Sequence, residues 1–393
     1  MIEIKNKINC TSCGACYNIC PVNAIEMVED NEGFKYPKVD AQKCIQCGLC
    51  DKTCPIYNKK EINNSKTPKV FAAWSKDEFI RLDSTSGGIF SELAKQIYSE
   101  NGYVCGAVYN EEWMVEHFIS NNIKDLDKIR SSKYLQSNIN YIFREIKEKL
   151  INGSKVLFCG SPCQVHGLYN YLQKDYKNLI TVDFICRGMN SPKIFKKYIE
   201  NLEQKYKSKI SYIKFKNKIN GWHNFSTKID FENGNTYIGG RYYDSYMIGY
   251  LKYNAFMRPS CYDCKFKDLP KMADITVADF WGIENINKKL DENKGTSMVL
   301  INSKQGEELF EQIKKNINFQ EIVSNKIFEG NICMQNSVEK TPNRQLVFEN
   351  IDNLSYEELH KKYFPSPNLI EKVKIFFNTN KYAMKIKKII KRK

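Results

Sequence analysis

The sequence predicts a mixed α/β (α+β) chain that is built from more than one domain. Its 393 residues exceed the usual size of a single domain. Eight of the 15 cysteines lie within the first 54 residues, in two copies of one spacing. Farther along, apolar strand-like runs alternate with amphipathic helical segments, as in 155–159, 165–173, 180–185 and 192–206. We therefore predict a cysteine-rich N-terminal domain followed by an α/β core.

Both N-terminal cysteine runs read C-x2-C-x2-C-x3-C-P, which is the ligand run of bacterial [4Fe–4S] ferredoxins. The first three thiolates of such a run bind one cluster, and the fourth binds the other. A pair of zinc sites is the alternative, but zinc sites usually join two CxxC pairs. We predict a dicluster ferredoxin fold over 1–58, a conduit for single electrons. Its first cluster would use Cys10, Cys13, Cys16 and Cys54, and its second Cys44, Cys47, Cys50 and Cys20.

Composition excludes several other classes of protein. No run of about 18 apolar residues occurs, so the sequence predicts no membrane span. The first ten residues contain no apolar segment typical of a secretory signal. We therefore expect a cytoplasmic protein, in which thiols stay reduced. Fifteen cysteines in that compartment indicate metal or redox chemistry.

The remaining chain is expected to contain a polar linker over 59–68, domains over 69–150 and 151–330, and a C-terminal helical extension over 331–393. A strand over 70–74 precedes the loop Ser84-Thr85-Ser86-Gly87-Gly88 and an amphipathic helix. This loop is either a phosphate-binding helix start or an ordinary helix cap. Neither a GxGxxG nor a P-loop motif is present. Residues 210–240 alternate like antiparallel strands around an Asn-Gly turn.

A second cysteine group is less obvious. Cys261 and Cys264 form a CxxC pair, whereas Cys163 and Cys186 each follow the end of a predicted strand. If those strands are parallel neighbours, both cysteines lie at the same edge of the sheet. The four thiols would then form a third cluster. Two alternatives stay open: small buried hydrophobes, or a nucleophilic Cys163 at a helix start.

Several motifs occur in one order between about residues 70 and 310: STSGGIFS, RSSKY, VLFCGSPCQVHGL, VDFICRGMNSP, RPSCYDC and ADITVADFWGI. In this combination the chain resembles the coenzyme F420 hydrogenase/dehydrogenase beta-subunit family, in which an N-terminal ferredoxin fusion is common. The resemblance implies a mixed α/β flavin-binding core that holds FAD. It also implies a third [4Fe–4S] cluster at Cys163, Cys186, Cys261 and Cys264, and flavin contacts at Ser86, Gly87, Gly88, Lys133 and Gln164.

One departure from the family pattern concerns Cys186-Arg187-Gly188, where the family usually has Cys-His-Gly. A fixed positive charge replaces an imidazole that can carry a proton, so any role of that histidine is in doubt here. The resemblance also does not establish the deazaflavin coenzyme as the substrate.

The net charge of +15 is concentrated at the C-terminus. Residues 381–393 contain seven Lys or Arg and no acid, which leaves 15 − 7 = +8 for the rest. This tail is either a basic amphipathic helix on the inner membrane surface or a solvated extension. A basic surface would steer an acidic carrier such as ferredoxin or flavodoxin. No nucleic-acid-binding module accompanies the charge, so we do not expect nucleic acid.

We expect an iron–sulfur flavoprotein oxidoreductase. It would pass electrons from a ferredoxin-type donor through [4Fe–4S] clusters to FAD and on to a two-electron acceptor. The alternative is an electron-transfer subunit without its own substrate, which delivers electrons to a partner dehydrogenase, hydrogenase or biosynthetic enzyme. No motif in the sequence identifies a residue as a catalytic acid or base.

Overall fold

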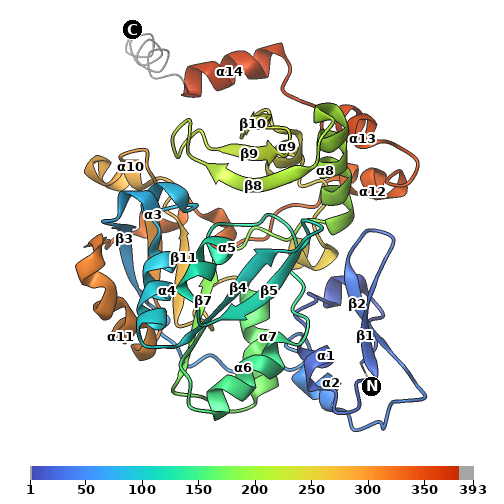
Figure 1. Cartoon of the computed structure of the whole chain (residues 1–393), viewed down its shortest axis with the longest axis vertical. Helices are drawn as coiled ribbons and strands as arrows, with labels where there is room; N and C mark the ends of the chain where they lie inside the picture. The colour runs from blue at the N-terminus through green and yellow to red at the C-terminus, as the bar shows by residue number, and fades with distance from the viewer. Residues whose placement is uncertain (1, 380–393) are drawn as a thin grey trace. The chain divides into compact units, whose positions relative to one another are not determined.

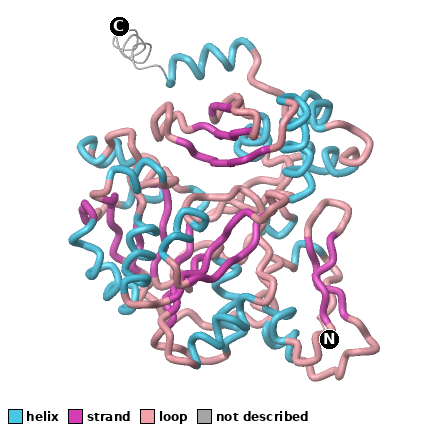
Figure 2. Tube along the Cα trace, viewed as in Figure 1, coloured by secondary structure: helices cyan, strands magenta, loops and turns pink. Residues whose placement is uncertain are grey.

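The computed structural model describes residues 2–379, which form two compact units (Figure 1). The first unit contains residues 1–193 and 257–339, and the second contains 194–256 and the chain from 340 onward. The basic tail over 381–393 lies outside the described residues. Figure 2 shows the same trace coloured by secondary structure.

An eight-stranded mixed sheet organises the first unit, in the order β13-β3-β12-β11-β7-β6-β4-β5. The strands β4, β6, β7 and β11 are parallel, and β3 runs in the same direction because both β3 and β11 pair antiparallel with β12. Five carboxyl ends therefore meet at one edge of the sheet. The strands are β3 (Lys69–Ser75), β4 (Tyr103–Tyr109), β5 (Val115–Ser120), β6 (Val156–Cys159), β7 (Leu179–Phe184), β11 (Ile275–Asp279), β12 (Ser297–Ile301) and β13 (Ile317–Glu321).

Helices cover both faces of this sheet (Figure 1). On one face, α4 (Ile89–Ser99) and α11 (Lys304–Ile313) pack on a core that includes Leu157. On the other, α6 (Ile142–Ile151) and α7 (Pro162–Leu172) pack on a core that includes Phe158. Neighbouring residues of β6 thus enter opposite cores, as expected when side chains alternate across a strand. Shorter helices of this unit are α3 (Glu78–Asp83), α5 (Leu126–Ile129), α10 (Ile283–Ile286) and the 3-10 helices Lys7–Asn9, Ile123–Asp125, Pro259–Asp263, Lys288–Leu290, Lys314–Asn316, Asn325–Phe328 and Ile332–Met334.

The N-terminal part of the first unit repeats one local structure twice. Its elements are α1 (Ala15–Ile19), β1 (Ile25–Glu29), β2 (Lys35–Val39) and α2 (Leu49–Thr53), and β1 pairs antiparallel with β2. Each short helix starts after a left-handed glycine, at φ 79° for Gly14 and 71° for Gly48. Two residues earlier, Ser12 and Gln46 have φ 55° and 54°. The repeated spacing therefore produces the same backbone turn in both cysteine runs.

The second unit holds a three-stranded antiparallel sheet of order β10-β9-β8. Its buried Asp244 accepts hydrogen bonds from the hydroxyls of Tyr198, at 2.7 Å, and Tyr237, at 2.9 Å. Its elements are α8 (Pro192–Tyr206, which begins at the end of the first unit), β8 (Ile210–Asn217), β9 (Ser226–Phe231), β10 (Thr236–Gly240), α9 (Ser245–Leu251), α12 (Pro342–Glu349), α13 (Tyr356–Tyr363) and α14 (Leu369–Thr379).

The predicted fold class is confirmed. The helix expected over 192–206 forms α8, and the Asn-Gly turn joins β9 to β10 with Gly234 at φ 84°. Among the described residues, no helix combines the length and the apolar character needed to cross a membrane.

Candidate metal centres

The first cysteine group encloses one small cavity. Its walls include the thiols of Cys10, Cys13, Cys16 and Cys54 together with apolar side chains such as Ile2, Ile4 and Ile56. Burial raises the pKa of Cys16 well above its ordinary value, and the nearby thiols of the other three cysteines raise it further. The structure therefore brings the fourth cysteine of the second run to the first three of the first run.

The second group lies in the small core between α1, α2 and the β1–β2 hairpin. Cys20 is buried there, and Cys44 and Cys50 pack partly buried against the same core, whereas Cys47 is exposed. Backbone amides already donate to two of these sulfurs, from Ile2 to Cys50 Sγ at 3.3 Å and from Ala24 to Cys20 Sγ at 3.2 Å. N–H groups directed at sulfur are among the features that tune iron–sulfur clusters.

The spacing of the thiols distinguishes two kinds of metal site. Within residues 2–379, no three Cys, His, Asp or Glu side chains lie close enough to hold a single metal ion. In a [4Fe–4S] cluster each thiolate binds a different iron, so the ligands are farther apart than those around one zinc. A cavity lined by four cysteines together with apolar side chains and the loop residues Asn9, Thr11 and Ser12 thus fits a cubane better than a single ion.

The third group gathers at the carboxyl edge of the sheet. Cys163 opens α7 directly after β6, Cys186 follows β7, and Cys261 and Cys264 lie in and just after the 3-10 helix Pro259–Asp263. Burial raises the pKa of Cys163 to about 12, and the charges of Cys264 and Cys261 add to the effect. Burial also raises the pKa of Cys186, with contributions from Cys261, Cys163 and Cys264. All four thiols therefore lie within electrostatic reach of one another.

Gly188 makes room for this group. A Cβ at this position would lie 2.5 Å from Met257 Sδ and 3.1 Å from Cys261 Cβ. The amide of the next residue, Met189, donates to Cys261 Sγ at 3.3 Å. The residue beside it, Arg187, directs its Nη1 toward Cys333 Sγ at 4.0 Å. The position where the family pattern has histidine thus faces Cys333.

The third group adjoins the first. The charge of Cys163 raises the pKa of Cys13, after the larger effect of burial. The side chain of Thr11, between Cys10 and Cys13, lies close enough to Cys163 to lower the pKa of its thiol. The structure therefore joins the two groups through a ferredoxin loop and the start of α7.

The residues expected near a flavin lie at the same sheet edge but already have partners in the fold. Ser86 Oγ donates to the carbonyl of Thr296 at 2.9 Å, and Gly87 N–H donates to Ser297 Oγ at 2.9 Å. Gly88 begins α4 with φ 89°. A Cβ on Gly87 would lie 2.4 Å from the carbonyl oxygen of Ala73. The glycines are thus required for close packing, whatever else the loop binds.

Lys133 and Gln164 are likewise bonded within the fold. Lys133 Nζ donates to the carbonyls that end α5, at Ile129, Arg130 and Ser131. Burial lowers the pKa of Lys133 to about 7. Gln164 Oε1 accepts from the Ser161 N–H at 2.9 Å and closes a capping box on α7. The segment around Lys133 also contacts the glycine loop, because the Ser132 N–H donates to Thr85 Oγ1 at 2.8 Å.

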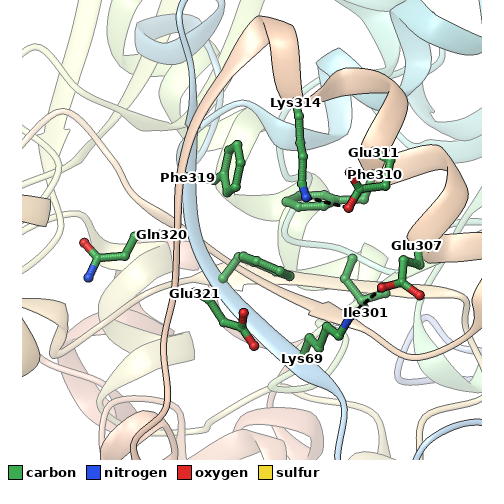
Figure 3. Close-up of a pocket in the computed structure, with 10 residues that line it drawn as sticks. Lys69, Ile301, Glu307, Phe310, Glu311, Lys314, Phe319, Gln320 and Glu321 are labelled. Carbon is green, nitrogen blue, oxygen red and sulfur yellow. Dashed lines mark hydrogen bonds and ion pairs between the residues drawn. The ribbon is translucent and has the colours of Figure 1, made fainter.

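A separate pocket lies at the opposite edge of the sheet, at the start of β3 (Figure 3). Two ion pairs cross it, Lys69 with Glu307 and Lys314 with Glu311. Its apolar walls include Phe71, Phe310 and Phe319, and it contains none of the residues predicted from the sequence.

The fold and the cysteine groups define an iron–sulfur protein in which a dicluster domain precedes an α/β core. Comparison with known families agrees: residues 9–58 match the 4Fe–4S dicluster domain, and residues 153–325 match the C terminus of the coenzyme F420 hydrogenase/dehydrogenase beta subunit. The resemblance is therefore confirmed. One segment of the chain thus matches a dicluster domain, and another matches the C-terminal domain of the coenzyme F420 hydrogenase/dehydrogenase beta subunit.

Two similar proteins come from methanogens. The F subunit of the F(420)H(2) dehydrogenase of Methanosarcina mazei is 27% identical over 169 residues, which is 40% of this chain and 46% of that protein. The matched part thus spans less than half of that relative. A chain of the F420-reducing [NiFe] hydrogenase complex from Methanosarcina barkeri superposes with a TM-score of 0.47 at 18% identity, covering 76% of this chain and 91% of that one.

Proposed function

We propose that the chain is an iron–sulfur flavoprotein oxidoreductase that transfers electrons between a protein carrier and a two-electron acceptor. The observation that carries this proposal is the close approach of the first and third cysteine groups, where α7, the helix that contains Cys163, packs against Cys13 through Gly167. Electron transfer needs closely spaced centres. A ferredoxin domain whose first group adjoins a further four-thiol group supports a continuous path into the α/β core.

Three [4Fe–4S] clusters would supply one-electron steps, and FAD would convert them into two-electron chemistry. The eight N-terminal cysteines would hold two clusters. The third group, Cys163, Cys186, Cys261 and Cys264, would hold the third. Its thiols lie at the carboxyl edge of the sheet, which is where open α/β folds place their ligands.

FAD would bind at the same edge, along the loop Ser86-Gly87-Gly88 and beside Lys133 and Gln164. The contact between Ser132 and Thr85 supports this placement because it joins the two segments. Since the side chains of Lys133 and Gln164 are bonded to the fold, they would act mainly by shaping this edge.

An acidic ferredoxin or flavodoxin is the proposed carrier. The loop at Cys47 is exposed; Lys43 directly precedes its cysteine run and Lys52 lies within it. The exposed side chain of Ile45 adds an apolar contact. This exposed loop suits a docking surface through which electrons would enter.

A second candidate function is that of a subunit without its own substrate. The Methanosarcina mazei relative is named as a subunit of a dehydrogenase, which favours a partner enzyme for this chain as well. Purification of the tagged chain from its host under anaerobic conditions distinguishes the two. If a second protein co-purifies in a fixed ratio and reduces the final acceptor, whereas this chain alone does not, the chain is an electron-transfer subunit.

A peripheral contact with an anionic membrane is also proposed. Helix α14 exposes Leu369, Ile370, Val373 and Phe376, and the sequence then continues into the basic residues 381–393. Apolar and cationic groups together bind anionic lipid surfaces. Deletion of 381–393 should abolish sedimentation with anionic liposomes, and unchanged sedimentation would refute the contact.

Anaerobic purification with iron, sulfide and flavin assays tests the main proposal. Three clusters give about 12 iron atoms per chain and two give about 8. We expect about 12, with loss of about 4 in Cys261→Ser. The matched control is Cys105→Ala, which alters a cysteine buried within β4 and should leave the iron unchanged.

Two results would contradict parts of this proposal. An iron content near 8 that Cys261→Ser does not lower would remove the third cluster. Failure of the reconstituted chain to retain FAD would remove the flavoprotein function and leave an electron-transfer subunit.

A further inference from the structure

We propose that Arg258 is a positioning residue that supplies one positive charge to both the first and the third cysteine groups and sets the reduction potential there. This inference rests on the proposed clusters. Arg258 stands three residues before Cys261 and is 1% exposed, which is exceptional for the most strongly basic side chain. A charge so deeply buried requires a compensating partner.

The guanidinium reaches across to the ferredoxin domain. Its Nε donates to the carbonyl of Cys10 at 2.8 Å, and its Nη2 donates to the carbonyl of Lys35 at 3.0 Å. Its Nη1 donates to Gln136 Oε1 at 3.0 Å. The rings of Tyr36 and Phe34 lie 4.2 and 5.3 Å from its central carbon. Arg258 is therefore held in one place by contacts on three sides.

None of these contacts neutralises the charge. Within the described part of the chain, every hydrogen-bond acceptor of the guanidinium is an uncharged oxygen. Removing one partner of a buried ion pair is strongly destabilising because it leaves a buried charge without a counter-charge. The guanidinium of Arg258 is likewise a buried charge, and no acidic side chain among the described residues accepts a hydrogen bond from it. The guanidinium instead lies beside the first cysteine group, since its Nε donates to the carbonyl of Cys10, a proposed cluster ligand.

Four thiolates around a [4Fe–4S] core carry net negative charge, so a loaded cluster provides the missing counter-charge. Cys10 belongs to the first group and Cys261 to the third, and Arg258 contacts the chain beside both. Its amide donates to the carbonyl of Met189 at 2.9 Å, and its own carbonyl accepts from the Cys261 N–H at 3.0 Å. The backbone of Arg258 thus stabilises the loop that contains Cys261, while its side chain binds the carbonyl of Cys10 in the first group.

Gln136 extends this connection. While its Oε1 accepts from Arg258, its Nε2 donates to the carbonyl of Thr11 at 3.1 Å. Thr11 in turn lies beside Cys163. The charge of Arg258 therefore lies among the contacts that connect the first and third cysteine groups, and not at the surface of either group.

Arg144 provides a matched comparison. It also donates to ferredoxin-domain carbonyls, from Nε to Asn18 at 2.7 Å and from Nη2 to Cys20 at 2.9 Å, and it stacks on Tyr141. However, Arg144 is half-buried, so water screens its charge. Because its Nη2 lies beside the carbonyl of Cys20, a proposed ligand of the second cluster, loss of Arg144 should change the field there, but less than loss of the fully buried Arg258.

A buried positive charge favours the reduced, more negative form of a cluster and raises its reduction potential. Redox titration followed by electron paramagnetic resonance measures this directly. We expect Arg258→Gln to move at least one midpoint to more negative values at full iron content. Arg258→Lys, which keeps the charge, should stay closer to the wild-type midpoint, and Arg144→Gln should shift the midpoints less than Arg258→Gln does.

Gln136→Glu tests the same charge without removing Arg258. The new carboxylate would pair with Nη1 and should produce the same negative shift. Unchanged midpoints in Arg258→Gln or, if that variant loses its iron, in Gln136→Glu would overturn the inference. A shift of equal size in Arg144→Gln would overturn it as well. If wild-type protein binds no iron, the proposed clusters fail instead, so the two failures are distinguishable.

Discussion

Gly167 of α7 lies directly against Cys13 of the ferredoxin loop. A Cβ on Gly167 would stand 3.0 Å from both the Cβ and the Sγ of Cys13 and 3.4 Å from its carbonyl oxygen. Glycine inside a helix normally costs about 1 kcal/mol relative to alanine. Its presence here is therefore explained by the close approach of α7 to a proposed cluster ligand.

Gly167→Ala should consequently fail to give the usual helix stabilisation of about 1 kcal/mol. Because the added methyl group presses on Cys13, we expect a lower iron content and a lower melting temperature, and a larger loss in Gly167→Val. Gly240→Ala is the control, since a Cβ there meets only an ordinary contact with Tyr243 at 3.7 Å. An iron content equal to wild type with a raised melting temperature in Gly167→Ala would contradict the steric argument.

Gln164→Leu should destabilise the protein by about 1–2 kcal/mol, because the Ser161 N–H at the start of α7 loses its acceptor. Gln164→Glu keeps that acceptor and replaces the Nε2 group that donates to the hydroxyl and the carbonyl of Ser137, so at acidic pH, where its buried carboxyl is neutral, it should cost less. Urea unfolding of both variants measures the difference. If both bind FAD like wild type once their folded fractions are equal, Gln164 shapes the site without contacting the flavin.

His117 should make stability depend on pH. Burial lowers its pKa from 6.5 to about 4, and the charge of Lys133 lowers it further, while a hydrogen bond to the carbonyl of Cys159 acts in the opposite direction. The folded-state pKa is below the unfolded one, so the unfolded chain takes up the proton first as the pH falls. The contribution of neutral His117 to the free energy of unfolding is fully present above pH 6.5 and is lost between pH 6.5 and 4.

Urea unfolding at pH 7.5 and 5.5 checks this dependence, and wild type should lose about 1 kcal/mol more than His117→Phe over that interval. The phenyl ring can keep the stacking of His117 on Phe158, whose ring centroids lie 5.4 Å apart. His166→Phe is a companion variant, because burial lowers the pKa of His166 to about 3. Equal pH slopes in wild type and His117→Phe would contradict the assignment.

The exposed loop at Cys47 should govern the rate of reaction with an acidic carrier. Charge reversal in Lys43→Glu/Lys52→Glu should slow reduction by an acidic ferredoxin several-fold at low salt, since steering depends on long-range charge. The difference should shrink at high salt because ions screen exposed charges. Lys361→Glu, at an exposed lysine paired with Glu357, is the control. Equal slowing in the control would show a general charge effect and no specific docking.

Much of the first unit could be predicted from the sequence because its signals are local. The cysteine spacing predicts both ferredoxin loops, and apolar runs predict β6 and β7 with the helices that follow them. The insertion of β12 between β3 and β11 could not be predicted in this way. Strand order depends on pairing between segments more than 200 residues apart, for which a single sequence contains no signal.

The roles of individual side chains were harder to predict. Arg258 appears in the sequence only as the residue before a proline, and its contact with Cys10 spans 248 positions. Lys133 and Gln164 were expected at a flavin through family resemblance, but whether such a side chain faces a ligand or a helix end depends on tertiary packing. The four thiols of the third group were predicted because each follows a strand or forms a CxxC pair.

The order in which the cysteines enter the chain has a consequence for synthesis. All ligands proposed for the first two clusters are made by residue 54, whereas the third group is complete only when Cys264 has left the ribosome. The surface of the ferredoxin domain that later meets α7 and Arg258 is therefore uncovered while most of the chain is still being translated. Iron delivered early would meet a small open domain, and oxygen would reach the same clusters until the α/β core has folded over them.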